Sequence, residues 1–250
     1  MTIEKFTGKA LIYEKYRPTY PKAFIDYLYA DEGFSDQSVI ADIGSGTGIL
    51  SKQLLEMGSH VIGVEPNNEM RQLAEKKCSS YVNYSSVNGA AEHTTLPDNS
   101  VNFITVAQAF HWFDAKRFYI ECQRILKNNG KVVLVWNSRN TNDEITKESE
   151  RICEQCCPEF KGFSGGMEEN SEEIISFFKD GHCEVKTFDN NVLSDLDHFI
   201  GRFLSSSFAP KENEPNYKRF VDGLTELFMK YSDNGVLTIT HTTRSYAGNV

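Results

Sequence analysis

Between Val39 and Trp136 the sequence alternates short apolar runs with segments of helical periodicity, and this alternation constrains the fold most. The apolar runs predict five strands: VIADI (39–43), HVIGVE (60–65), YVNYSSV (81–87), VNFITVAQ (101–108) and KVVLVW (131–136). Because strands that alternate with helices are joined by right-handed crossovers, the pattern predicts an α/β fold with a parallel, doubly wound sheet covered by helices on both faces.

The boundaries of the intervening helices carry their own signals. The helix after the first strand is expected to stop at Gly58, and Asn67 or Asn68 is expected to cap the next one. Asp114 is expected to cap a third helix, which the residues NNG at 128–130 would close.

Past Trp136 the pattern loosens, and we expect a helix followed by a mobile loop from about Pro158 to Met167. Two further strands and two helices are predicted beyond it: the strands at 184–189 and 236–248, and the helices at 196–207 and 217–231.

Three glycines follow the first strand at every second position, as Gly44, Gly46 and Gly48. They allow a tight turn and bring the backbone close to a ligand at the edge where such sheets bind one. A dinucleotide loop would place its third glycine at residue 49, which is Ile49 here. Asp42 disfavours a pyrophosphate and suits a ligand that carries an ammonium group.

Glu65 lies about twenty residues beyond the glycine loop, at the end of the second predicted strand. From that position a carboxylate can accept hydrogen bonds from ribose hydroxyls. A solvated acid at a strand end is the alternative interpretation. Together with Asp42, Glu65 favours an adenosine-containing ligand with an amino-acid end.

The stretches DIGSGTG and VIGVEPNNEM resemble two motifs of class I S-adenosylmethionine-dependent methyltransferases. The resemblance continues through NGAAEHTTLPDNSVNFITVAQAFHWFD, ECQRILKNNGKVVLVWNSR and YEKYRPTYP, and looks closest to the small-molecule branch that includes trans-aconitate and ubiquinone or menaquinone methyltransferase-like proteins (methyltransferase type 11). It implies a Rossmann-like, mostly parallel seven-stranded sheet with an antiparallel last strand. It also implies S-adenosyl-L-methionine as cofactor and methyl transfer as activity.

The resemblance implies a role for individual residues of the glycine loop and the second strand. The backbone of Gly44, Ser45 and Gly46 would contact the methionyl part of the cofactor. Asp42 would lie near its ammonium group, and Glu65 would hold the ribose.

Further cofactor contacts follow from the same resemblance. Pro66 and Asn67 would flank the adenine on one side, and Ala91 and Glu92 would enclose it from the other side. Gln108 would contribute backbone near the methionyl group and the reacting sulfur.

The N-terminal segment carries two more residues that resemble cofactor-binding positions of this branch. Tyr13 and Arg17 resemble lid residues, and Arg17 would pair with the methionine carboxylate. Ordinary packing of an aromatic amphipathic helix is the alternative for both.

The acceptor side is less defined by the sequence. The aromatic residues Phe110, Trp112 and Phe113 are expected to exclude water at the end of the fourth strand, with Phe110 and Trp112 as candidate substrate residues. His111 is the candidate for removing a proton from an oxygen, nitrogen or carbon acceptor, with a wall residue as the alternative. Arg202 would bind a carboxylate substrate, or else would be a helix surface residue.

Two positions depart from the pattern of the resembled family. Asn102 stands where an aspartate is usual in strand four, and residues 128–130 read NNG where lysine, proline and glycine are common. Both positions are expected to be structural, so neither casts doubt on cofactor binding.

The chain is therefore expected to be one methyltransferase domain in three segments. Residues 1–35 would form N-terminal lid helices, 36–139 the cofactor-binding half, and 140–250 the substrate-side half. Its partner would be a small-molecule methyl acceptor, and the oligomeric state stays open.

Three alternatives to a small-molecule methyltransferase remain open. They are a nicotinamide-dependent oxidoreductase, a non-catalytic protein that binds S-adenosylmethionine, and a methyltransferase of protein or RNA. The net charge of −9 disfavours nucleic-acid binding, which depends on clustered Lys and Arg.

The N-terminal residues lack the apolar core of a signal peptide, and no apolar run approaches a membrane span, so a cytoplasmic protein without membrane association is expected. Of the six cysteines, only Cys153, Cys156 and Cys157 have metal-like spacing. A second matching pair is missing, so reduced thiols and no metal are expected.

Overall fold

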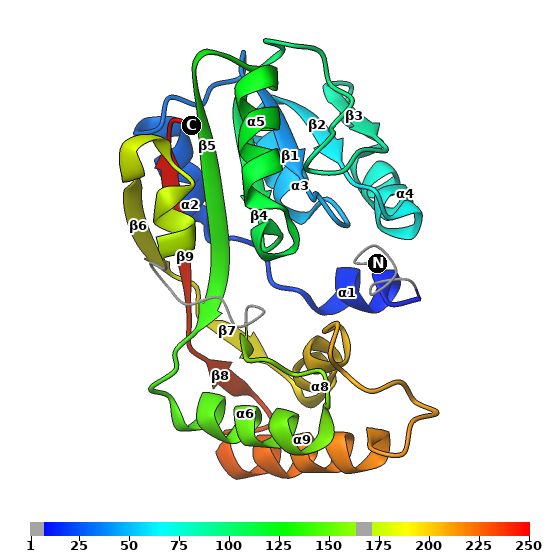
Figure 1. Cartoon of the computed structure of the whole chain (residues 1–250). Helices are drawn as coiled ribbons and strands as arrows, with labels where there is room; N and C mark the ends of the chain where they lie inside the picture. Colours follow the sequence, from blue (N-terminus) through cyan, green and yellow to red (C-terminus); the bar gives the residue numbers. More distant parts are fainter. Residues whose placement is uncertain (1–7, 164–171) are drawn as a thin grey trace.

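Figure 1 shows the computed structural model of the chain, which describes residues 8–163 and 172–250. A seven-stranded sheet with the strand order β3-β2-β1-β4-β5-β9-β6 is its centre. The strands are β1 (Val39–Ile43), β2 (His60–Val64), β3 (Tyr84–Val87), β4 (Val101–Ala107), β5 (Leu126–Arg139), β6 (Glu184–Asp189) and β9 (His241–Gly248). Strands β1 to β5 pair in parallel, whereas β9 runs antiparallel to β5 and β6. The predicted fold class is confirmed.

Helices cover both faces of the sheet, as the parallel connections require. They are α2 (Lys22–Ala30), α3 (Ile49–Glu56), α4 (Asn68–Cys78), α5 (Ala115–Ile125) and α7 (Glu172–Ser176). Neighbouring strand residues point to opposite faces, so Ile40 packs with α2 and α3 whereas Ala41 packs with α5. The sheet is therefore buried between two apolar clusters.

A second group of elements follows the carboxyl end of β5. It consists of α6 (Glu144–Cys156), β7 (Val192–Ser194), α8 (Leu196–Leu204), α9 (Tyr217–Tyr231) and β8 (Leu237–Ile239). Their apolar faces meet in a third cluster that contains Phe199, Phe203, Phe220 and Leu224. In Figure 1 this C-terminal lobe lies below the sheet, and the long strand β5 leads into it. It thus faces the carboxyl ends of the parallel strands.

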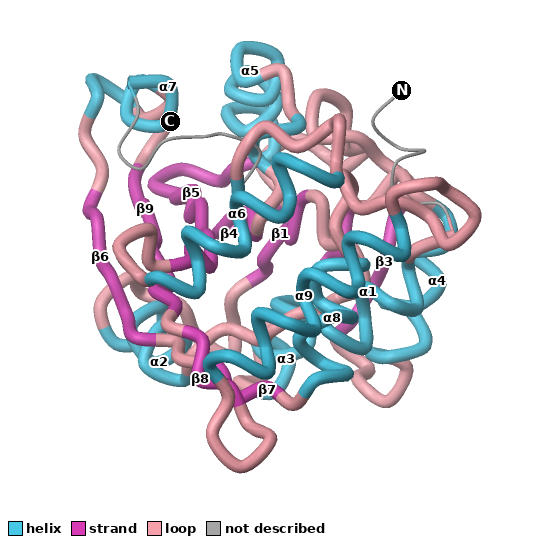
Figure 2. Tube along the Cα trace, turned by 90° about the horizontal axis from the view of Figure 1, so that it is seen from below, coloured by secondary structure: helices cyan, strands magenta, loops and turns pink. Residues whose placement is uncertain are grey.

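The N-terminal helix α1 (Ala10–Tyr16) packs against α8 of the C-terminal lobe, and Figure 2 shows the two helices side by side. Lys15 Nζ and the Tyr16 hydroxyl each donate to Asp197 Oδ2 at 3.0 Å. Lys9 Nζ donates to the carbonyl oxygens of Ser206 and Ala209 at 2.8 and 2.9 Å. The start of the chain is therefore tied to the lobe that follows the sheet.

Two predicted helix caps are confirmed. The Asn67 side chain accepts from the Met70 amide at 3.1 Å, and the Asp114 side chain accepts from the amides of Lys116 and Arg117 at 3.1 and 3.2 Å. Asn102, the departure in strand four, has a structural role because its Oδ1 accepts from the Val39 amide at 3.0 Å.

Two predicted boundaries are wrong. Residues 128–130 do not close α5 by a loop, because β5 starts at Leu126, next to the end of the helix, and the register with β4 shifts at this point. The strand predicted at 236–248 is two strands, since β8 pairs with β7 and β9 joins the large sheet. The predicted loop includes residues 164–167, which lie outside the described residues.

None of the helices within the described ranges has the length and apolar composition needed to span a membrane. In the same ranges, no group of three or more His, Cys, Asp and Glu side chains is arranged to hold a metal ion. Cys153, Cys156 and Cys157 are buried in the apolar cluster of the C-terminal lobe.

Two helical glycines allow a matched test of the contact between α1 and α8. A Cβ at Gly201 in α8 would lie 2.5 Å from Tyr16 Cδ2 and Cζ, whereas a Cβ at Gly223 in α9 would meet the Ile152 side chain at 3.5 Å or more. We expect Gly201→Ala to lower the free energy of unfolding by about 2 kcal/mol through overpacking. Gly223→Ala should raise it by up to about 1 kcal/mol through helix propensity.

Urea unfolding of the two variants measures these differences. Limited proteolysis should also cut the N-terminal segment faster in Gly201→Ala, because its anchor on α8 is displaced. Equal stabilisation by both substitutions would contradict the tight Tyr16 contact.

Candidate functional site

A cavity of about 260 Å³ lies at the carboxyl ends of β1, β2 and β4, and we call it the cofactor cavity. Its walls combine the glycine loop, the end of β2 and the segment after β4. The lining residues are Tyr13, Gly44, Gly46, Glu65, Pro66, Asn67, Met70, Ala90, Ala91, Glu92, Ala107, Gln108, Ala109, Trp112 and Phe113. Most of the predicted cofactor residues are thereby brought together.

Glu65 joins the loop after β1 to the loop after β2. Its Oε2 accepts from the Gly46 amide at 2.9 Å and its Oε1 from the Asn67 amide at 2.8 Å. The side chain is buried, and burial raises its pKa while the two amides act in the opposite direction. Among the described residues each oxygen accepts one of these bonds, which leaves a second lone pair on each oxygen.

Four amides of the glycine loop are bound within the protein. Those of Gly44 and Ser45 donate to the Val64 carbonyl at 2.8 and 3.2 Å, and the Gly48 amide donates to the Ser45 carbonyl at 2.9 Å. The Gly46 amide donates to Glu65, so none of these four N–H groups is left to donate to a ligand. A phosphate site at such a loop needs free amides, so these four amides are not available to a pyrophosphate.

The three glycines are required for different reasons, although all have positive φ angles. A Cβ at Gly44 would lie 2.7 Å from Ala109 Cβ, and one at Gly48 would lie 3.1 Å from Ala74 Cβ. A Cβ at Gly46 would meet no atom within 4 Å. Because Gly46 lines the cavity, its missing side chain leaves the space that a ligand would occupy.

Asp42 and Ser45 are not among the residues that line the cofactor cavity. The Asp42 side chain is 1% exposed and accepts from Ser51 Oγ at 2.5 Å and Thr105 Oγ1 at 2.9 Å. Its carboxylate therefore ties β1 to α3 and β4 beneath the glycine loop. The structure thus separates Asp42 from the position that the sequence suggested for it.

Gln108 follows β4 with a positive φ of 60°. Its amide donates to the Val135 carbonyl at 2.9 Å, and its Nε2 donates to the Asn137 carbonyl at 3.3 Å. These bonds hold the turn that separates the cofactor cavity from a second cavity.

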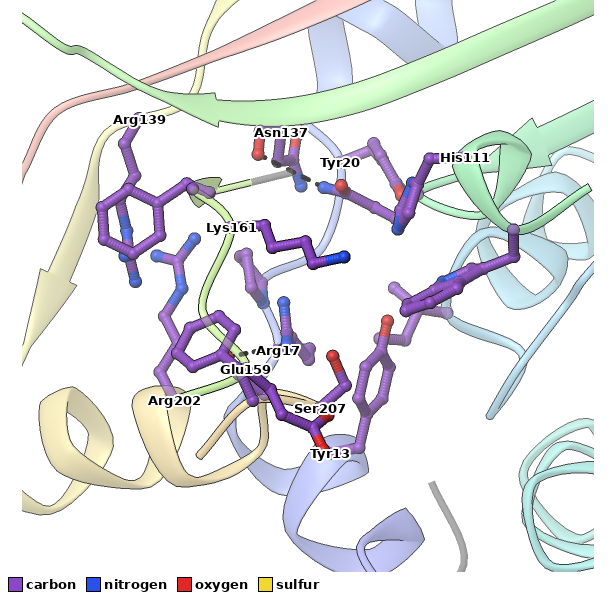
Figure 3. A pocket seen from close by; sticks show the side chains of 18 of the residues that line it. Tyr13, Arg17, Tyr20, His111, Asn137, Arg139, Glu159, Lys161, Arg202 and Ser207 are labelled. Carbon is purple, nitrogen blue, oxygen red and sulfur yellow. Dashed lines mark hydrogen bonds between the residues drawn. The ribbon is translucent and has the colours of Figure 1, made fainter. Parts of the chain in front are cut away.

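The second cavity has a volume of about 670 Å³, and we call it the acceptor cavity. Figure 3 shows how its side chains converge from the N-terminal segment, the ends of β4 and β5, residues 158–163 and the end of α8. It is lined by Tyr13, Arg17, Pro18, Tyr20, Ile49, Gln108, His111, Trp112, Asn137, Arg139, Pro158, Glu159, Lys161, Gly162, Phe163, Arg202, Ser206, Ser207 and Phe208. Tyr13, Gln108 and Trp112 line both cavities.

Sequence-predicted residues divide between this cavity and the core. Arg17, His111, Trp112 and Arg202 line the acceptor cavity, so Arg17 is on the acceptor side rather than in the cofactor cavity. Phe110 is a correction to the prediction of a substrate residue, because its ring is 1% exposed and packs in the core under α5. The 3₁₀ turn η2 (Phe110–Trp112) explains this division, since neighbouring residues of a turn point in different directions.

The sequence reasoning missed Arg139 and Lys161. Arg139 is the last residue of β5, and its position at the carboxyl end of a parallel strand is a signal that could have identified it. Lys161 lies in the segment read only as a loop, where no pattern distinguished it.

The pKa of Asp42 gives a stability test of its buried position. Burial raises that pKa from 3.8 to about 6, against the hydrogen bonds from Ser51 and Thr105. The folded state therefore binds more protons than the unfolded state between these pH values, and this contribution to stability is lost as pH rises through 6. Relative to Asp42→Asn, the wild type should lose about 2 kcal/mol of unfolding free energy from pH 4 to pH 7.

Denaturant titrations of both proteins across this pH range measure the difference. Asp26→Asn, an exposed aspartate on α2, controls for the substitution itself. A difference between wild type and Asp42→Asn that is independent of pH would contradict the buried carboxylate.

Comparison with known proteins agrees with this geometry. A family model described as a methyltransferase domain matches residues 41–134. An uncharacterised methyltransferase of Mycobacterium tuberculosis is 38% identical over 128 residues, which cover 51% of this chain and 50% of that protein. The matched segment thus spans about half the length of this relative.

Two further proteins are similar over almost the whole chain. An uncharacterised methyltransferase of Schizosaccharomyces pombe is 25% identical over 240 residues, covering 92% of each protein. A solved structure described as "a Putative Type II Methyltransferase from Anaeromyxobacter dehalogenans" has the same fold, with a TM-score of 0.68 and 20% identity over 93% of this chain and 97% of the other. Residues 41–134 thus match a methyltransferase domain, and the chain as a whole shares the fold of the solved structure.

Proposed function

We propose that the chain transfers a methyl group from S-adenosylmethionine to a small-molecule acceptor. The observation that carries this proposal is the wall that the two cavities share, formed by Tyr13, Gln108 and Trp112. A cofactor on one side and an acceptor on the other can be aligned there for in-line displacement. The acceptor cavity, at about 670 Å³, has the size of small-molecule sites.

The residues of the cofactor cavity fit S-adenosylmethionine. We assign the ribose to Glu65, the adenine to Pro66, Asn67, Ala91 and Glu92, and the methionyl part to the glycine loop and Gln108, with Tyr13 covering the cavity from α1. The open space at Gly46 and the free lone pairs of Glu65 support this assignment. When bound, S-adenosylmethionine supplies a methyl group activated by a positively charged sulfur.

Three features favour this function over its alternatives. The four occupied amides of the glycine loop disfavour the pyrophosphate of a nicotinamide dinucleotide. The described walls of the acceptor cavity come from six segments, which suits a small ligand rather than a protein or RNA. The second cavity beside the cofactor cavity offers room for an acceptor, which favours an enzyme over a non-catalytic binding protein.

His111 is the residue that we propose as proton acceptor for acceptors that must lose one. It lines the acceptor cavity, and its Nδ1 is buried without a hydrogen-bond partner in the part of the chain that the structure describes. Burial and then the charge of Arg17 lower the pKa of His111 to about 4. The imidazole is therefore neutral near pH 7, so a ring nitrogen is available to accept a proton, but the low pKa also makes it a weak base.

Replacing Glu65 tests the cofactor assignment. Glu65→Gln places an amide NH₂ group against one of the two backbone N–H groups, so the Kd for S-adenosylmethionine should rise about 10- to 100-fold. Calorimetry measures this effect, with the surface variant Glu56→Gln in α3 as control. Tight NAD binding together with no response to S-adenosylmethionine would overturn the proposed function.

Replacing His111 tests its role as base. Labelled-methyl transfer into a metabolite extract, followed by mass identification of the product, first supplies the acceptor. With that acceptor, His111→Gln should lower kcat about 100-fold at pH 7.5 while the KM for S-adenosylmethionine changes little. A kcat within twofold of wild type would make His111 a wall residue and leave the methyl transfer itself standing.

A further inference from the structure

The acceptor cavity carries positive charge in a protein whose net charge is −9. Its described lining includes four cationic side chains, Arg17, Arg139, Lys161 and Arg202, against the single acidic residue Glu159. Figure 3 shows Arg139 and Arg202 on the side of the cavity opposite His111 and Tyr13, with Lys161 and Arg17 between them. This arrangement concentrates positive charge away from the wall shared with the cofactor cavity.

Of these four groups, Arg202 has the greatest need of a negatively charged partner. It is 8% exposed, and its Nε and Nη1 are buried without an acceptor among the described residues. Burial, then the charges of Arg139 and Arg17, lower its pKa well below the usual value. A guanidinium remains charged in proteins, and a buried charge without a partner is costly.

Arg139 is held in place by aromatic rings rather than by acids. Its guanidinium carbon lies 4.0 Å from the centre of the Phe163 ring and 4.3 Å from that of Phe203. Its Nη1 is buried and has no acceptor within residues 8–163 and 172–250. The two rings orient the guanidinium without neutralising it, which leaves its donors for a ligand.

Arg17 is positioned by neutral partners. Its Nε donates to Ser205 Oγ at 3.0 Å and its Nη2 to Ser206 Oγ at 3.3 Å. It also lies 4.7 Å above the Tyr13 ring. The hydroxyls fix the side chain while its positive charge stays in the cavity.

We propose that the methyl acceptor is an anion whose carboxylate or phosphate group binds Arg139 and Arg202, with Arg17 as a third contact. That the bound anion is the methyl acceptor rests on the proposed function, whereas the anion site itself does not. One guanidinium group can donate two hydrogen bonds to the oxygens of a carboxylate or phosphate group. Two guanidinium groups therefore fix the orientation of a ligand as well as select for its negative charge. The bound end lies opposite His111, so the acceptor reaches the shared wall with its other end.

The acceptor therefore has two functional parts: an anionic group for recognition and a separate nucleophile for methylation. A molecule with only one of these parts would bind without reacting or fail to bind. Arg139 and Arg202 are accordingly specificity-determining residues that do not touch the transferred methyl group.

Binding of simple anions tests the proposal without any catalytic assay. We would titrate the full chain with succinate, propane-1,2,3-tricarboxylate, inorganic phosphate and glycerol 3-phosphate at constant ionic strength, using calorimetry and thermal unfolding. At least one of these anions should bind and raise the Tm, and its Kd should rise about 10- to 100-fold in Arg139→Met and in Arg202→Met. The carboxylates and phosphates then distinguish the two anion types.

Arg219→Met is the matched control, because Arg219 lies on α9 outside the acceptor cavity and donates to Gln155 at 3.1 Å. This variant should bind the anion as the wild type does. Without anion, Arg202→Met should unfold at a temperature equal to or above that of the wild type, since it removes an uncompensated buried charge. This result also shows that the variant is folded.

Two outcomes would overturn the anion site: no binding of any of these anions to the wild type, or equal Kd values in wild type and both cavity variants. Calorimetry with S-adenosylmethionine separates this failure from that of the proposed function. Cofactor binding without anion binding would contradict only the proposed anion site. Anion binding without cofactor binding would contradict only the proposed methyl transfer.

Discussion

The site depends on the position of β1 between two parallel neighbours. β1 pairs with β2 on one side and with β4 on the other, so the helices that follow β1 and β4 leave toward opposite faces of the sheet. A crevice must open between them at the carboxyl ends. Asp42 holds this point together from below, because it accepts from α3 and β4 at the same time.

The two cavities that meet at this crevice have opposite electrostatic character. The cofactor cavity contains the carboxylates of Glu65 and Glu92, which suits a cationic cofactor. The acceptor cavity contains guanidinium groups with few acids near them. In the proposed function, charge would separate the two ligands at their shared wall, and the buried arginines cost stability that a bound anion would offset.

The local parts of the fold were predictable from the sequence. The boundaries of β1, the caps Asn67 and Asp114, and the place of Glu65 in the cofactor cavity depend on neighbouring residues and on spacing along one βαβ unit. Side-chain direction was less predictable. Phe110 and His111 are adjacent, yet one enters the core and the other faces a cavity, because a 3₁₀ turn changes the direction at each residue.

The sequence by itself determined the alternating fold, the glycine turn and the cofactor class, since each is encoded in residues close together in the chain. Only the tertiary structure decided which side chains line the acceptor cavity. Arg17, Arg139 and Arg202 come from the N-terminal segment, the end of β5 and α8, and packing alone brings them to one cavity. Their charge indicates an anionic ligand because the groups are buried and have no acid partners among the described residues. Burial is a property of the folded chain.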